Sequence, residues 1–124
     1  MKPVLMTCGE PAGVGPELAV TVRARLGAGL PFAWIGDAAH LPPGTRIRQI
    51  ATPEEALEVP ADLLPVLQHD FAGQAVPGKP DPANAQGVID VIARAVSLAT
   101  EGRALGICTL PINKKALKDG AGFA

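Results

Sequence analysis

The chain has 124 residues and a formal net charge of −1, from 11 basic and 12 acidic side chains. It has no basic stripe and only three Phe and one Trp, so nucleic-acid binding is not expected. Its apolar runs are shorter than the roughly 18 residues of a membrane span, and the first is too short for a signal peptide, so the expected location is cytoplasmic.

The composition favours one α/β domain, or a large part of one. Hydrophobic residues make up 48% of the chain and are mostly Ala, Val, Leu and Ile, which is typical of buried parallel sheets. The 14 Gly and 13 Pro cluster between the apolar segments and therefore separate ordered elements.

The first half of the chain predicts strands at residues 3–7 and 32–35, with a helix at residues 16–26 between them. Pro16 suits the first turn of that helix. The residues expected on its apolar face are Leu18, Ala19, Val22 and Leu26. Residues 46–50 alternate between apolar and polar, which predicts a strand near an edge with one solvated face.

The middle of the chain predicts a short helix and another strand. Thr52 and Glu55 have the spacing of a capping box, which predicts a helix ending near residue 58. Residues 63–68 predict a strand, and Pro65 within it favours an edge position or a bulge because proline has no N–H to donate.

The last third predicts a Gly- and Pro-rich loop at residues 70–80 and then the longest helix, at 81–99. Residues 104–110 predict a strand buried on both faces, and residues 111–118 predict a final helix. Alternating strands and helices imply a mostly parallel sheet with flanking helices, whose ligands bind beyond the carboxyl ends of the strands.

Two segments follow strands and are expected to share one crevice. The first, residues 9–15, carries glycines at a spacing that differs from the dinucleotide fingerprint G-x-G-x-x-G. Such a loop is either a tight structural turn or a preformed ligand site. A bare carboxylate would repel phosphate, so Glu10 is expected to accept hydrogen bonds or to point away.

The second segment begins at Thr109. Thr109 and Asn113 have polar groups for hydrogen bonding, and Lys114 could neutralise a phosphate or carboxylate. Asn113 is equally well interpreted as a helix cap. Lys115 and Lys118 are expected to be solvated.

The remaining candidate side chains predict no chemistry. Cys8 and Cys108 are expected to be small buried residues that form neither a disulfide nor a zinc site. His40 and His69 are isolated and are expected to be ordinary loop residues. No catalytic residue and no metal ligand is assigned.

Three motifs together carry a family resemblance. TCGEPAGVGPE at residues 7–17, DPANAQG at 81–87 and TLPINKKAL at 109–117 resemble the 4-hydroxythreonine-4-phosphate dehydrogenase family of pyridoxal phosphate biosynthesis. The glycine loop also resembles, more distantly, the G-D-G-I-G-P-E loop of isocitrate and isopropylmalate dehydrogenases. The resemblance implies the N-terminal part of their α/β fold.

The resemblance also implies chemistry and partners. The family uses NAD (or NADP) to oxidise the 3-hydroxyl of a small phosphorylated hydroxy amino acid, which then loses carbon dioxide to give 3-amino-2-oxopropyl phosphate. Three histidines hold a divalent metal, and the enzyme is expected to be a homodimer. By the same resemblance, Gly13, Val14 and Gly15 would border the cofactor, while Thr109, Asn113 and Lys114 would line the substrate crevice.

One departure from the family limits this expectation. The chain stops before the family's Gly-His-Thr-Glu segment, its metal ligands and its second domain, so residues 1–124 are expected to be the N-terminal part of an α/β dehydrogenase domain, inactive alone. Two alternatives stay open. One is a related dehydrogenase of dihydrodiols or phosphorylated sugar acids, and the other is a non-catalytic module that binds phosphate or nucleotide.

Overall fold

Strands and helices alternate along the chain in the computed structural model, which describes residues 2–122. The strands are β1 (Val4–Thr7), β2 (Phe32–Gly36), β3 (Ile47–Ile50), β4 (Leu64–Gln68) and β5 (Gly106–Thr109). The α-helices are α1 (Gly15–Leu26), α2 (Ala85–Thr100) and α3 (Lys114–Ala121). The 3-10 turns are η1 (Gly27–Gly29), η2 (Ala38–His40), η3 (Pro53–Glu58) and η4 (Pro82–Asn84). The predicted α/β class is confirmed.

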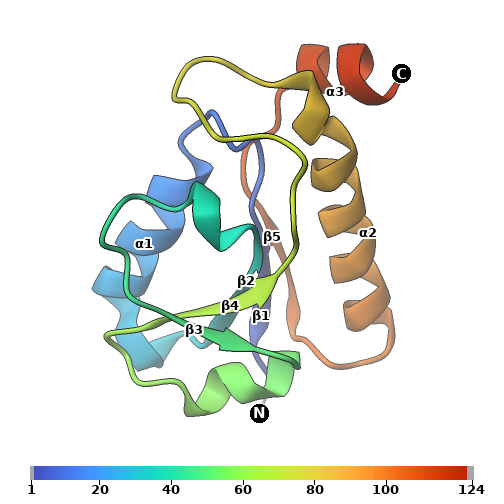
Figure 1. Ribbon diagram of the computed structural model, residues 1–124. Helices are drawn as coiled ribbons and strands as arrows, with labels where there is room; N and C mark the ends of the chain where they lie inside the picture. The colour runs from blue at the N-terminus through green and yellow to red at the C-terminus, as the bar shows by residue number, and fades with distance from the viewer. Residues whose placement is uncertain (1, 123–124) are drawn as a thin grey trace.

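The five strands form one parallel sheet in the order β3-β4-β2-β1-β5. The chain leaves β1 toward β2 through α1, and later returns to the other side of β1 through α2 and β5. The two helices accordingly cover opposite faces of the sheet (Figure 1). This reversal makes the carboxyl ends of β1 and β5 the topological switch point, where parallel sheets usually bind their ligands.

The core lies around β1, β2 and β4. Its fully buried apolar residues include Leu5, Ala19, Phe32, Ala33, Trp34, Ile35, Val66, Leu67, Val91 and Ala95. Each large side chain among them contributes about 1.5–3 kcal/mol through its removal from water. This core fixes the frame on which the loops at the carboxyl edge are mounted.

The position of Pro65 differs from the prediction. Strand β4 is interior, between β3 and β2, and its pairing continues without a bulge. Pro65 pairs in register with Arg48 of β3, whereas the pairing with β2 begins one residue later, at Val66. The Leu64 N–H donates to the Arg46 carbonyl on the β3 side, so by alternation the nitrogen of Pro65 faces the β2 side, just before the pairing with β2 begins.

The prediction that residues 104–110 are buried on both faces is wrong. Strand β5 is an edge strand of the described sheet, and Ile107, Cys108 and Thr109 are exposed. Cys8 is buried as expected, but Cys108 is exposed, and both thiols are free. An apolar run cannot reveal which strand takes the edge, because that depends on the order of strands in space.

The packing face of α1 also differs from the apolar pattern. Leu18 and Leu26 are 38% and 47% exposed, whereas Ala19 and Arg23 are buried. The guanidinium of Arg23 donates to four backbone carbonyls, including Val59 at 3.1 Å. Helix α1 is thus held by Ala19, whose small side chain permits close packing, and by Arg23. A pattern of apolar residues does not predict a buried arginine.

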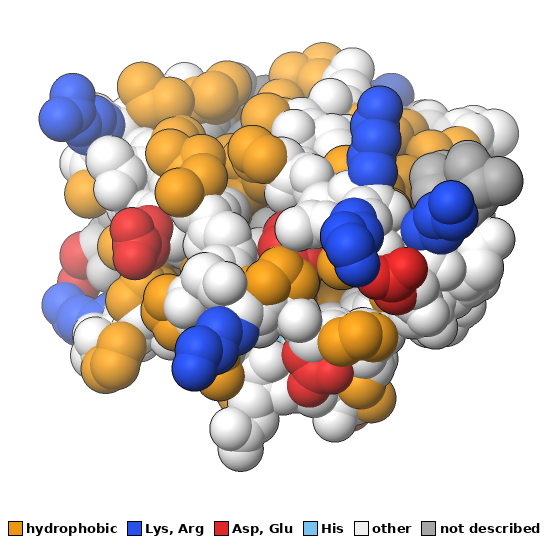
Figure 2. All heavy atoms as spheres, turned by 90° about the horizontal axis from the view of Figure 1, so that it is seen from above, with side chains coloured by type: hydrophobic (Ala, Val, Ile, Leu, Met, Phe, Trp, Pro, Cys, Tyr) orange, Lys and Arg blue, Asp and Glu red, His pale blue; other side chains and the backbone are white. Residues whose placement is uncertain are grey.

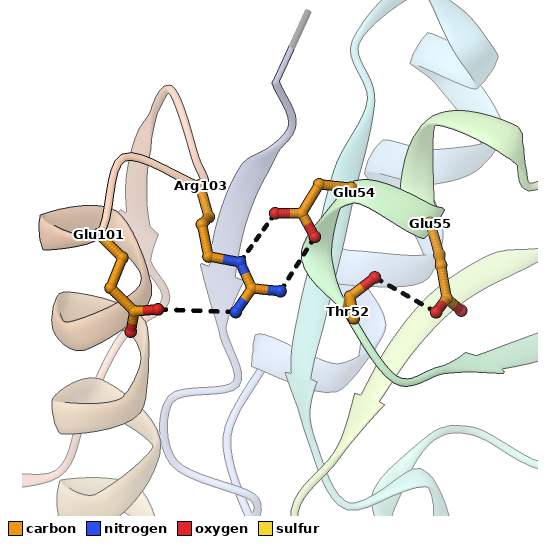
Figure 3. Close-up of polar contacts among 5 residues, drawn as sticks. All are labelled: Thr52, Glu54, Glu55, Glu101 and Arg103. Carbon is orange, nitrogen blue, oxygen red and sulfur yellow. Dashed lines mark hydrogen bonds and ion pairs between the residues drawn. The ribbon is translucent and has the colours of Figure 1, made fainter.

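Turn η3 begins where the capping signal predicts, after Thr52, but its polar contacts differ from a capping box. The Thr52 hydroxyl donates to the Glu55 carboxylate (Figure 3). The same carboxylate accepts the Ala51 N–H. In the same turn, Glu54 forms a two-pronged ion pair with Arg103, at 2.8 and 3.0 Å. Hydrogen bonds from Arg103 are the main cause that lowers the pKa of Glu54 to about 2.

Among residues 2–122, no helix has both the length and the apolar content needed to cross a bilayer.

Candidate functional site

The two segments predicted to bind ligands, residues 9–15 and 109–114, lie side by side at the carboxyl edge of the sheet, and we call them the first and second corners. Strands β1 and β5 are paired with Thr7 opposite Thr109. Beyond them, the Leu110 N–H donates to the Thr7 carbonyl at 3.4 Å, and the Glu10 N–H donates to the Pro111 carbonyl at 2.8 Å. The two segments therefore meet at the switch point of the sheet, and that they line one shared crevice stays a prediction.

Two glycines of the loop are required by this close approach. Gly9 has φ of +68°, and a Cβ there would lie 2.5 Å from the Pro111 carbonyl oxygen. A Cβ on Gly15 would overlap the Cys8 carbonyl oxygen. Gly15 is one of the three residues expected to border the cofactor. It is buried, and its lack of a Cβ lets the loop pack closely on Cys8.

The tip of the loop faces solvent. Gly13 and Val14 are exposed, and Val14 as a whole residue is 55% accessible. Val14 is the residue before α1, and no side chain caps the helix there. Pro16 has no N–H, so at the start of this helix the N–H groups without a side-chain cap are those of Gly15 and Glu17, at the position where helix starts bind ligands.

A groove of about 430 Å³ runs beside this tip. It lies between the glycine loop and the residues around η2, and its polar lining includes Glu17 and His40. Prolines contribute much of the remaining wall: Pro11, Pro16, Pro42, Pro43 and Pro77. Proline fixes φ, so the groove is shaped before any ligand arrives.

The second corner presents Thr109 and Lys114 and keeps Asn113 occupied. Thr109 and Lys114 are exposed. The Asn113 side-chain oxygen accepts the Ala116 N–H at 3.0 Å and caps α3, which is the alternative considered for this residue. Helix α3 thus begins at Lys114, three residues after the predicted start, because the cap sets the first turn.

The neighbouring lysine of α3 is paired rather than simply solvated. Lys115 is 85% exposed and forms an ion pair at 2.6 Å with Asp119, one turn along the helix. Hydrogen bonding by Asp119 raises the pKa of Lys115. Lys118 is exposed, as expected.

A polar network that the motifs did not reveal holds residues 70–80 over the corners. This segment crosses the top of the molecule between β4 and η4, and we call it the strap (Figure 1). The Asn84 side chain accepts from the Gly73 N–H at 2.8 Å and donates to the Gln74 carbonyl at 3.0 Å. The Gly78 N–H donates to the Ala12 carbonyl at 2.9 Å.

Asp37 anchors the start of the strap. Its carboxylate accepts the Phe71 N–H and the Gln68 side-chain amide, both at 3.0 Å, and the Ala39 N–H. Burial alone would raise the pKa of Asp37, but these hydrogen bonds outweigh it and the net shift is downward. Asp37 also caps η2 through the Ala39 N–H, whereas its link to the strap depends on β2 and β4 being neighbours in the sheet.

The histidines serve the strap as well. His40 Nε2 lies 2.8 Å from the Gly73 carbonyl oxygen, and the rings of His40 and His69 both pack edge-on against Phe71. Within residues 2–122, no three His, Cys, Asp or Glu side chains gather in a way that could hold a metal ion. The described side chains therefore do not fit a metal centre.

The carboxyl edge carries charges of both signs. Figure 2, seen from above, shows basic and acidic side chains interspersed with apolar ones on this face. A small ligand with both anionic and hydrogen-bonding groups suits such a surface better than a polyanion does.

Comparison with known proteins decides the family. Residues 31–124 match the family model described as "Pyridoxal phosphate biosynthetic protein PdxA". The chain belongs to the PdxA family. Two curated relatives are 4-hydroxythreonine-4-phosphate dehydrogenases, from Paracoccus denitrificans (58% identical) and Roseobacter denitrificans (56% identical).

Both alignments cover 98% of this PdxA-family chain but only 36% and 37% of the relatives, respectively. The chain thus spans little more than a third of their length.

Solved structures agree with this assignment. A 4-hydroxythreonine-4-phosphate dehydrogenase from Klebsiella pneumoniae matches with a TM-score of 0.87 at 31% identity, covering 100% of this chain and 41% of that one. A terephthalate 1,2-cis-dihydrodiol dehydrogenase from Burkholderia xenovorans matches with a TM-score of 0.75 at 20% identity, over 99% of this chain and 38% of that one. At that identity the second likeness establishes a shared fold and nothing more.

Proposed function

We propose that this chain supplies the ligand-binding corner region of a 4-hydroxythreonine-4-phosphate dehydrogenase, as the amino-terminal part of its α/β dehydrogenase domain. The observation that carries the proposal is the meeting of two of the three family motifs, residues 7–17 and 109–117, at one sheet edge, with a hydrogen bond from Glu10 to Pro111. Relatives of that activity at up to 58% identity support it.

The proposed reaction oxidises the 3-hydroxyl of the phosphorylated hydroxy amino acid. The hydrogen on carbon leaves as a hydride, the hydroxyl proton leaves to a base, and the resulting β-keto acid loses carbon dioxide. NAD (or NADP), when bound, supplies the hydride acceptor. We assign neither the base nor any other catalytic residue to the described part of the chain.

The residues of this chain act by binding and orientation. The exposed tip at Gly13 and Val14 offers backbone contact to the cofactor, while Gly15 keeps the loop closed behind it. The Thr109 hydroxyl and the Lys114 ammonium are free to bind the phosphate or carboxylate of the substrate. Asn113 takes part through its side-chain amide hydrogens, since its oxygen caps α3.

The metal that the family resemblance implies has no ligand set among residues 2–122. We therefore derive no step through a metal, and we expect the chain to show no turnover alone. A cytoplasmic homodimer remains part of the proposal. The apolar edge at β5, including Leu105 at 69% exposure, supports self-association.

A chimeric enzyme tests the proposal. This chain replaces the corresponding segment of the Paracoccus denitrificans relative, and reduction of NAD by the phosphorylated substrate is measured. We expect turnover close to that of the parent enzyme. Lys114→Ala should raise KM roughly tenfold or more through loss of a charge-assisted contact. The matched control Lys118→Ala, in the same helix, should leave KM unchanged.

A folded chimera without turnover would contradict the proposal. If the isolated chain then bound inorganic phosphate or NAD in calorimetry, the non-catalytic binding module would be the better description. Turnover of the isolated chain would contradict our expectation that it is inactive alone.

A further inference from the structure

Glu10 is a buried carboxyl in the loop proposed to bind the cofactor. It is only 6% exposed, although acidic side chains are rarely buried without a charged partner. In residues 2–122, no basic side chain lies within ion-pair distance of it. A buried carboxyl that lacks a counter-charge is costly, and a stable fold keeps one where its hydrogen bonds matter.

Three groups of Glu10 make three separate links. Its Oε1 accepts the Ala12 N–H at 3.2 Å, and its backbone carbonyl accepts the Gly13 N–H at 3.0 Å. Its own N–H donates to the Pro111 carbonyl at 2.8 Å. The same residue therefore closes the turn of the glycine loop and joins it to the second corner.

Ala12 is held from both sides as a result. Its N–H is bound by Glu10 and its carbonyl by the Gly78 N–H of the strap. Ala12 is 7% exposed, whereas the next two residues, Gly13 and Val14, face solvent. The clamp on Ala12 thus determines which part of the loop reaches a ligand.

The inward position of Glu10 also removes its charge from the loop tip. Burial is the largest influence on this carboxyl and raises its pKa, although the Ala12 hydrogen bond and His40 oppose the shift. A loop that approaches an anionic ligand gains from this arrangement, because the Glu10 carboxylate is turned away from its backbone N–H groups, and of the two acidic residues of the motif Glu17 is the exposed one.

We propose that Glu10 is a positioning residue of this site, whose side chain orients the exposed tip at Gly13 and Val14 relative to the corner after β5. The inference deepens the proposed function and rests on it for the identity of the ligand, a nicotinamide dinucleotide. The effect of Glu10 on the loop can be measured without any ligand. The positioning role of Glu10 and the binding of the cofactor are therefore tested separately.

The test uses two neutral variants of similar size in the 124-residue chain. Glu10→Gln keeps an oxygen that can accept the Ala12 N–H, while Glu10→Met fills the space and keeps no acceptor. We expect amide exchange at Ala12 to be about tenfold faster in the Met variant and close to wild type in the Gln variant. Amides of β2 and β4 should be unchanged in both, and Glu58→Ala, at an exposed position, serves as the control.

Titration with NAD is the second readout. We expect the Gln variant to bind NAD as wild type does and the Met variant to bind it about tenfold more weakly. In the Met variant, the NAD-induced chemical-shift changes of the Gly13 and Val14 amides should be the first to disappear. Equal exchange at Ala12 in wild type and the Met variant, or faster exchange in both variants, would overturn the inference. A wild-type chain that binds no NAD counts against the cofactor proposal, while Ala12 exchange still decides the role of Glu10.

Discussion

Replacement of Arg23 by Met tests how α1 is attached to the sheet. Arg23 is 4% exposed and donates to the carbonyls of Leu63 (2.8 Å), Gly27 (3.2 Å), Val59 (3.1 Å) and Pro60 (3.0 Å). These bonds join the end of α1 to the segment that leads into β4. Methionine retains the length of the side chain and removes every donor.

The size of the effect follows from burial. A hydrogen bond from a charged group contributes about 1.5–3 kcal/mol when buried, and of the four bonds only that to Val59 is fully buried. Water can replace most of the others, since they are only partly buried. We therefore expect Arg23→Met to lower the free energy of unfolding by about 3 kcal/mol.

The assay is urea unfolding followed by circular dichroism. With a slope near 1.5 kcal/mol per M, typical of small proteins, the midpoint should fall by about 2 M. The matched control is Arg25→Met, at an exposed position of the same helix, which should change stability by less than about 0.5 kcal/mol. If the two variants unfold at the same urea concentration, the carbonyl contacts do not hold α1 and the reasoning is wrong.

Three further outcomes are expected. Gly9→Ala should lose at least about 2 kcal/mol of stability in the same assay, because φ is +68° and a backbone carbonyl blocks the new Cβ. The control Gly44→Ala, with φ of +81° but open space around the new Cβ, should lose only the backbone strain of about 1 kcal/mol. Equal losses would contradict the close fit of the corners. The pKa of Glu54 is lowered to about 2 from 4.5, so its pairing with Arg103 stabilises the fold above about pH 4.5 and is lost as the pH falls toward 2. The stability difference between wild type and Arg103→Met should therefore shrink between pH 4.5 and 2. A constant difference would refute the pairing. Ile107→Lys at the β5 edge should reduce self-association in sedimentation equilibrium, and an unchanged association constant would place the contact elsewhere.

Local patterns predicted most elements well because their causes are local. Alternation placed β3 at an edge, and Thr52 marked the start of η3. The same reasoning failed for Pro65 and for β5, since a strand's neighbours depend on the order of the sheet. Sequence patterns predict burial from hydropathy and local propensity alone. They therefore placed Pro65 at an edge although its strand is interior, and they buried the apolar strand β5 although it lies at an edge.

The sequence by itself determined the α/β class, the family motifs and the position of both loops after strands, because glycine spacing and apolar periodicity act along the chain. Only the tertiary structure decided that Glu10 turns inward, that Arg23 binds carbonyls and that the strap is bonded to Ala12. Each of these contacts joins segments that are distant in sequence or sets the direction of a side chain. Their free energy depends on burial and distance, which no linear pattern contains.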